Sequence, residues 1–144
     1  MRSLLLSVVF IGYIGFTTAQ TKNTQYSIDL ETNLIAMSAV SFNLQTPMGE
    51  KSSMIYSGGF VIGTGFGSGS NGVKAEVGLL SYGPKHFLET SVLYLSGFDD
   101  GGSIGGKLGY RYQTKKRLQL LANIYLLSNV DPFIMPTLGI GYKL

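Results

Sequence analysis

His86, Glu89 and Ser91 are the residues whose types could perform catalysis, because a histidine, a carboxylate and a serine together carry out nucleophilic hydrolysis. A small hydrolase that deacylates lipid A would have to present such a set to the membrane. The sequence around these residues alternates with the period of a β-strand, so residue 86 points to the opposite face from residues 89 and 91. The three side chains cannot meet without a β-bulge, and we expect no enzyme.

Metal and nucleotide sites are equally poorly supported. His86 is the only histidine of the chain, which excludes a site built from several histidines. Asp99 and Asp100 offer two carboxylates, whereas calcium takes about six to eight oxygen ligands. The glycine run at 63–67 is not followed by a helix whose amino terminus would bind a phosphate. We therefore predict no metal and no cofactor.

In the segments that would position these residues, the residue type alternates with a period of two. In Ser103–Gln113, apolar side chains alternate with glycine, lysine and arginine, and Thr137–Leu144 repeats this alternation at the carboxyl terminus. A period of two is typical of β-strands. A last strand of this kind is typical of a barrel that closes in an outer membrane.

The first nineteen residues predict a secretory signal peptide that is cleaved before Gln20. Arg2 precedes an apolar core at Leu4–Ile14, and small residues follow at the cleavage site. A retained spanning helix is disfavoured, because glycines interrupt the core and a span needs about 20 apolar residues. The predicted domains are the signal peptide at 1–19 and a single barrel domain at 20–144.

Composition points to a membrane protein without membrane-spanning helices after the signal. Charged residues are 13% of the chain, about half of the usual share of roughly 25%. The uncharged stretches Thr32–Gly49 and Ser52–Val73 are rich in polar residues or glycine, which is poor composition for a helix. A closed β-barrel is then the remaining way to satisfy the backbone in lipid. The balance of charge gives no indication of nucleic-acid binding, and the absence of cysteine excludes disulfides and a lipid-modified cysteine.

Turn residues divide the chain into segments of about ten residues, the length of a tilted spanning strand. The sequence predicts seven strands, at Leu34–Gln45, Met54–Phe66, Val73–Tyr82, His86–Ser96, Ser103–Gln113, Leu118–Ser128 and Met135–Leu144. Bacterial barrels have even strand numbers, with eight the smallest, so an eighth strand is expected at Tyr26–Glu31. One long, bent strand over Tyr26–Gln45 is the alternative. The predicted fold is all-β, a closed antiparallel transmembrane β-barrel of eight strands.

Alternation assigns the apolar side chains to lipid, and polar and small ones to the lumen. Charges in a narrow interior are costly unless they are paired. We therefore predict an ion-pair network that fills the lumen, made of Lys74, Glu76, Glu89, Lys107, Arg111 and Lys143.

A soluble barrel would show the same alternation with its faces inverted. Strand glycines favour the membrane barrel, because a narrow lumen needs small residues beside large ones, whereas glycine on a wet face weakens a strand for no gain. With an even number of strands and the carboxyl terminus in the periplasm, the basic turns at 50–51, 83–85 and 114–117 face the periplasm.

Three segments carry a resemblance to a known group: HFLETSVLYL at 86–95, GYRYQTKK at 109–116 and PTLGIGYKL at 136–144. In these segments the chain resembles small outer-membrane β-barrel proteins of Gram-negative bacteria, a group largely without assigned activity. The resemblance covers roughly the last sixty residues well. It implies a location in the cell outer membrane and assembly by the barrel-assembly machinery. Members commonly end in an aromatic residue, whereas this chain ends in Leu144, with Tyr142 two positions earlier.

The sequence therefore predicts a small outer-membrane barrel with a structural or interaction role. Its expected partners are outer-membrane lipid and lipopolysaccharide, together with the assembly machinery during biogenesis. The sequence identifies no other protein partner. Two alternatives remain open, a narrow channel for small solutes and a secreted soluble β-barrel that binds an apolar ligand in its interior.

Overall fold

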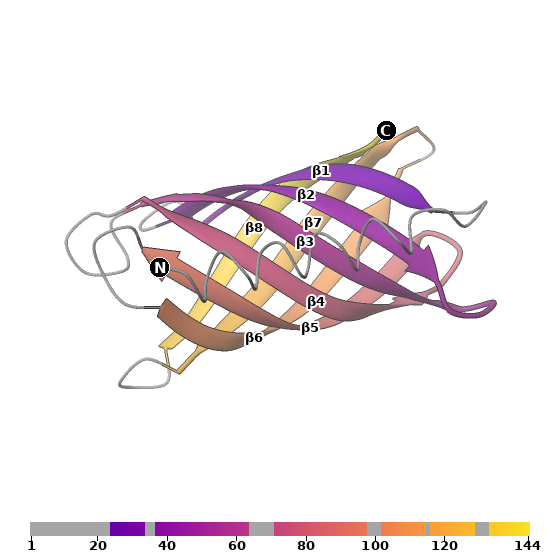
Figure 1. Ribbon diagram of the computed structural model, residues 1–144. Helices are drawn as coiled ribbons and strands as arrows, with labels where there is room; N and C mark the ends of the chain where they lie inside the picture. The colour runs from indigo at the N-terminus through magenta and orange to yellow at the C-terminus, as the bar shows by residue number, and fades with distance from the viewer. Residues whose placement is uncertain (1–23, 34–36, 64–70, 98–101, 115, 129–132) are drawn as a thin grey trace.

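The computed structural model describes residues 24–33, 37–63, 71–97, 102–114, 116–128 and 133–144. Eight strands occupy most of these ranges (Figure 1): β1 (Gln25–Thr32), β2 (Met37–Pro47), β3 (Ser52–Gly63), β4 (Gly72–Tyr82), β5 (His86–Gly97), β6 (Gly102–Gln113), β7 (Leu118–Leu127) and β8 (Phe133–Lys143). Across the same ranges, no helix is long and apolar enough to span a membrane. The predicted signal peptide at 1–19 lies outside the described residues.

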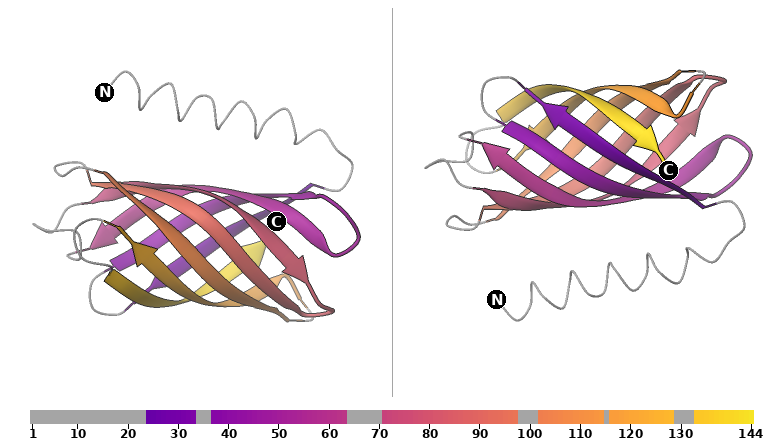
Figure 2. Two further views of the ribbon diagram at one scale, coloured as in Figure 1. Left: turned by 90° about the horizontal axis from the view of Figure 1, so that it is seen from below. Right: turned by 90° about the horizontal axis from the view of Figure 1, so that it is seen from above.

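The strands form one closed antiparallel barrel in which each strand pairs with its neighbours along the chain. The barrel closes where β1 pairs with β8, from Ser27 opposite Lys143 to Thr32 opposite Leu138. Figure 2 shows the tilted strands wrapping around a single axis. Closure leaves no strand edge without a partner strand, which is how a barrel avoids edge-to-edge association. The all-β, eight-stranded closed barrel predicted from the sequence is confirmed.

Two strands, and not one long one, occupy the segment from residue 26 to residue 45. The backbone N–H of Met37 donates to Asn33 Oδ1 at 2.9 Å, and the Asn33 N–H donates to the Met37 carbonyl oxygen at 3.0 Å. An asparagine side chain that accepts from the backbone in this way stabilises a tight turn. The second strand begins at Met37, and the predicted start at Leu34 lies outside the described residues.

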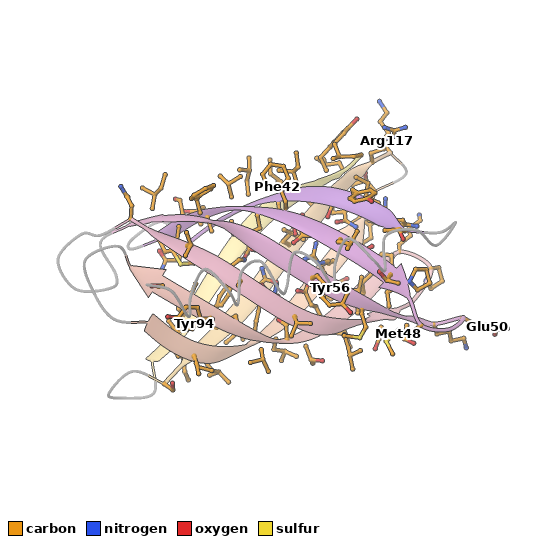
Figure 3. The ribbon with its side chains drawn as sticks, in the orientation of Figure 1. Phe42, Met48, Glu50, Tyr56, Tyr94 and Arg117 are labelled. Carbon is orange, nitrogen blue, oxygen red and sulfur yellow. The ribbon has the colours of Figure 1, made fainter. Side chains whose placement is uncertain are left out.

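Side chains alternate between the two faces of the wall, as the sequence predicts. Phe42 points away from the barrel in Figure 3, and about 60% of its surface is exposed. The other exposed apolar residues of the wall include Val40, Phe60, Ile62, Val77, Leu79, Leu88, Val92, Ile104, Leu108, Leu120, Ile124, Leu126, Leu138 and Ile140. Most of the residues between them are buried, so the wall is apolar outside and largely polar inside.

Three short turns and the carboxyl terminus lie at one end of the barrel (Figure 1). Backbone hydrogen bonds close these turns, among them Met48 N–H to the Ser52 carbonyl at 3.0 Å and Thr114 N–H to the Leu118 carbonyl at 3.0 Å. Met48 and Glu50 from one turn and Arg117 from another lie at this end in Figure 3. We call it the short-turn end.

Neighbouring glycines of β3 differ in how closely other strands approach them. A methyl group on Gly59 would overlap the carbonyl oxygen of Val40 and lie 2.8 Å from Ser41 Cα, whereas one on Gly58 would meet nothing within 4 Å. The backbone at Gly59 therefore has no room for a side chain.

We predict that Gly59→Ala lowers the free energy of unfolding by about 1–3 kcal/mol, because the new methyl group forces β2 and β3 apart. Gly58→Ala is the matched control and should leave stability unchanged or raise it by up to about 1 kcal/mol. Urea unfolding in detergent micelles measures both. Equal decreases in the free energy of unfolding for the two variants would contradict this account of how β2 and β3 pack.

Candidate functional site

The interior of the barrel contains seven buried charged residues in the part of the chain that the structure describes. They are Asp29 and Glu31 on β1, Lys74 and Glu76 on β4, Glu89 on β5, and Lys107 and Arg111 on β6. Members of one strand are two or four positions apart, which places them on the same face. The alternation of each strand therefore delivers all seven side chains to the lumen.

Arg111 joins three strands inside the barrel. Its Nε donates to Glu89 Oε2 at 2.5 Å, and its Nη1 donates to Asp29 Oδ2 at 2.6 Å. Because β1 and β6 are not neighbours in the barrel, the bond to Asp29 crosses the lumen. Charge-assisted bonds of this length are among the strongest that side chains make.

Lys107 links the acids of β4 and β5. Its Nζ lies 2.5 Å from Glu76 Oε1 and also pairs with Glu89 Oε1. Glu76 has two further partners, Lys74 Nζ at 3.4 Å and the Ser91 hydroxyl, which donates at 2.6 Å. The four charges alternate in sign, so the attraction of each pair offsets the cost of taking its members out of water.

Glu31 is the most fully hydrogen-bonded acid of the interior. Tyr125 Oη donates to its Oε2 at 2.5 Å, Asn123 Nδ2 at 2.8 Å and Thr137 Oγ1 at 3.3 Å. Lys74 Nζ donates to Oε1 at 3.2 Å. These donors come from β4, β7 and β8, so a single carboxylate links β1 to three other strands.

Apolar side chains fill the interior beyond the ion pairs. Toward the end opposite the short turns they form one buried cluster of Met37, Ala39, Val61, Leu93, Leu95, Tyr125, Leu127 and Met135. Ile55, Leu80 and Phe87 are buried toward the short-turn end. The lumen thus has a charged middle, an apolar cluster on one side of it, and a mixture of apolar and uncharged polar side chains on the other. This filled interior is expected of an eight-stranded barrel that is just wide enough for side chains.

Five of the six residues that the sequence assigns to the lumen network lie in these ion pairs: Lys74, Glu76, Glu89, Lys107 and Arg111. The sixth, Lys143, is half-buried, with its Nζ 5.5 Å from the centre of the Phe87 ring. Among the described residues, no ion pair includes it. Sequence reasoning missed Asp29 and Glu31, although their two-residue spacing in the short first strand carries the same signal.

The catalytic candidates do not converge. His86 lies on the exposed side of the wall, where its Nδ1 is hydrogen-bonded to the Tyr110 hydroxyl. Glu89 is bonded to Arg111 in the interior, and Ser91 donates to Glu76 and not to a histidine. Asp99 and Asp100 lie outside the described residues, and within those residues no group of three acids, histidines or cysteines could hold a metal ion.

Comparison with known proteins supports the fold alone. No protein-family model matches the chain, and no curated protein is similar to it. A solved structure from the de novo design of transmembrane β-barrels is similar, with a TM-score of 0.54 and 15% identity over 84% of this chain and 93% of the designed one. The chain therefore has the eight-stranded fold of a transmembrane β-barrel.

We predict that Glu89→Gln lowers the free energy of unfolding by about 3–5 kcal/mol, because it leaves Arg111 and Lys107 in the interior with one partner fewer. Glu50→Gln removes the same charge from an exposed turn and should cost less than about 0.5 kcal/mol. Denaturant unfolding of both proteins in the same micelles gives the comparison. If Glu89→Gln lowered the free energy of unfolding as little as Glu50→Gln, the buried ion pairs would contribute little to stability.

Proposed function

We propose that this protein is a small integral β-barrel of the outer membrane of a Gram-negative bacterium, with a structural or interaction role and an interior closed by side chains. Its lipid-facing wall, its charged interior and the sequence of its first nineteen residues each support a part of this proposal.

The distribution of charge is the main observation that supports the proposal. In the described ranges, every exposed charged side chain lies on a turn of the short-turn end: Glu50, Lys51, Lys85, Lys116 and Arg117. Every other charged residue there is buried or half-buried in the lumen. The outer face of the strands therefore offers lipid an uncharged surface, which is the arrangement of a membrane barrel and the reverse of a soluble one.

Aromatic residues of the outer face support the proposed position in the bilayer. Tyr26, Tyr110 and Tyr142 are exposed near the short-turn end, close to the basic turns. Tyrosine is enriched where the hydrocarbon core meets the headgroups, and basic turns attract anionic ones. From these features we place the short turns at a membrane interface. With an even number of strands and a periplasmic amino terminus, we assign the short turns and the carboxyl terminus to the periplasm, with phospholipid and lipopolysaccharide as the contacting lipids.

A shallow apolar groove on the outer face is consistent with contact between this face and lipid. It has a volume of about 520 Å³ and lies where Ala122 and Pro136 stand among the larger Leu108, Ile124 and Leu138. An acyl chain of a neighbouring lipid would fill such a groove, because apolar surface favours contact with hydrocarbon over water.

The Gram-negative outer membrane is supported by the predicted signal peptide and by the resemblance of the last sixty residues. Such a protein meets the barrel-assembly machinery during biogenesis, and its last strand, β8, ends with Tyr142 on the outer face. The separation of His86 from Glu89 and Ser91 supports a role other than lipid deacylation.

The first test is the membrane environment. We predict that Leu108→Arg destabilises the protein folded in lipid vesicles by about 2–4 kcal/mol, because Leu108 lies midway along β6 on the outer face. Met48→Arg, at an equally exposed position in a short turn, should cost less than about 1 kcal/mol. Equally small costs at both positions, with the native protein recovered from the periplasm without detergent, would favour a soluble barrel.

The second test concerns the interior. We predict that the protein, inserted into a planar bilayer, gives no stable conductance steps, because paired charges and closely packed apolar and polar side chains fill the lumen. Reproducible single-channel steps from the native protein would instead support the narrow channel for small solutes.

A further inference from the structure

The buried charges of the interior do not balance. Four carboxylates, Asp29, Glu31, Glu76 and Glu89, face three cations, Lys74, Lys107 and Arg111. An uncompensated charge inside a protein is so costly that the group neutralises by changing its protonation instead. The seven fully buried groups therefore carry one negative charge in excess, which a bound proton would remove.

Asp29 is the carboxylate with the fewest partners. The three buried glutamates each interact with at least two donors or cations. Asp29 is bonded through Oδ2 to Arg111, which is shared with Glu89, and its Oδ1 has no hydrogen-bond partner. The side chain is fully buried, so water does not reach this oxygen from outside.

A second unpartnered oxygen lies beside it. Gln119 is 1% exposed and its Oε1 has no partner, while its Nε2 donates to Gln113 Oε1 at 3.3 Å. Gln113 in turn donates its Nε2 to the Lys116 carbonyl oxygen, so it presents Oε1 to Gln119, and this favours the orientation in which Gln119 Oε1 points away from Gln113. A methyl group on Gly141 would meet Asp29 Oδ1 and lie 3.2 Å from Gln119 Oε1, so both oxygens lie around the same glycine. A single hydrogen shared by two such neighbouring acceptors would satisfy both.

We propose that Asp29 Oδ1 is a proton-binding site, and that the neutral carboxyl of Asp29 donates this hydrogen toward Gln119 Oε1. One proton supplies the missing positive charge and satisfies both oxygens, and the interior then contains three glutamates opposite three cations. A metal ion fits less well, because hard cations require more oxygen ligands than these two.

The charged groups around the site come from several strands. Arg111 on β6 contacts Asp29 directly, Glu89 on β5 lies behind Arg111, and Glu31 shares the inner face of β1. Lys143 on β8 lies two positions beyond Gly141 on the same face, but its Nζ is at the Phe87 ring near the short-turn end.

A chain of hydrogen bonds connects the site to the short-turn end. Gln119 Nε2 donates to Gln113 Oε1, and Gln113 Nε2 donates to the Lys116 carbonyl oxygen at 3.2 Å. A hydrogen donated by Asp29 to Gln119 continues this chain in the same direction. With this proton in place, both the Oε1 and the Nε2 of the buried Gln119 have hydrogen-bond partners.

Infrared spectroscopy of the refolded full barrel at neutral pH tests the site, because a protonated carboxyl absorbs in a band separate from carboxylates. We expect one such band, which shifts when aspartate carboxyls carry ¹³C and stays when glutamate carboxyls carry it. It should vanish in Asp29→Asn and persist in Glu50→Gln. Absence of the band in the native protein, or a band that follows the glutamate label, would overturn the proposal.

Stability provides a second test that does not depend on the membrane assignment. Asparagine reproduces a neutral aspartic acid, since its Oδ1 can accept from Arg111 while its Nδ2 donates to Gln119. We expect Asp29→Asn to change the unfolding equilibrium constant by less than about 10-fold, whereas Glu89→Gln should raise it by about 100-fold or more. A loss in Asp29→Asn as large as that in Glu89→Gln would mean that Asp29 is ionised.

Discussion

The pairing of opposite charges inside a dry barrel is the constraint on which the rest of this structure depends. An interior as narrow as that of eight strands has no bulk water to solvate a charge, and the outer face is mostly apolar. Each buried acid or base must therefore find its partner inside the lumen. Arg111 and Lys107 achieve this by bridging acids from different strands, with N–O distances of 2.5 and 2.6 Å at Glu89, Glu76 and Asp29.

These bonds also tie the first strand of the barrel to its far wall. β1 is the shortest strand and closes the barrel against β8, yet it contributes two of the four acids. Glu31 accepts hydrogen bonds from side chains of β4, β7 and β8, and Asp29 accepts one from Arg111 of β6. Register at the closing seam is therefore fixed by side chains inside as well as by the backbone ladder, because a slip of one residue would turn both acids outward.

The alternation of apolar and small residues predicts the strands within a few residues, as well as the inward face that contains Lys74, Glu76, Glu89, Lys107 and Arg111. It does not predict which acid meets which base, because several partners, such as Asp29 and Arg111, lie on strands that become close only when the barrel closes. Asp29 and Glu31 were missed because no inward face was assigned to the short first strand, although their two-residue spacing carries the same signal. Lys143 has the correct face, but it lies at the end of its strand over Phe87, beyond reach of the acids.

Neighbouring positions on β7 allow the most direct test of which face meets lipid. Ile124 is exposed on the outer wall and Tyr125 is fully buried in the lumen, and the chain has no tryptophan of its own. Single variants Ile124→Trp and Tyr125→Trp, each folded into vesicles with brominated acyl chains, report contact with hydrocarbon by fluorescence quenching. The account predicts strong quenching at position 124 and markedly weaker quenching at position 125. Quenching at neither position, or stronger quenching at 125, would contradict it.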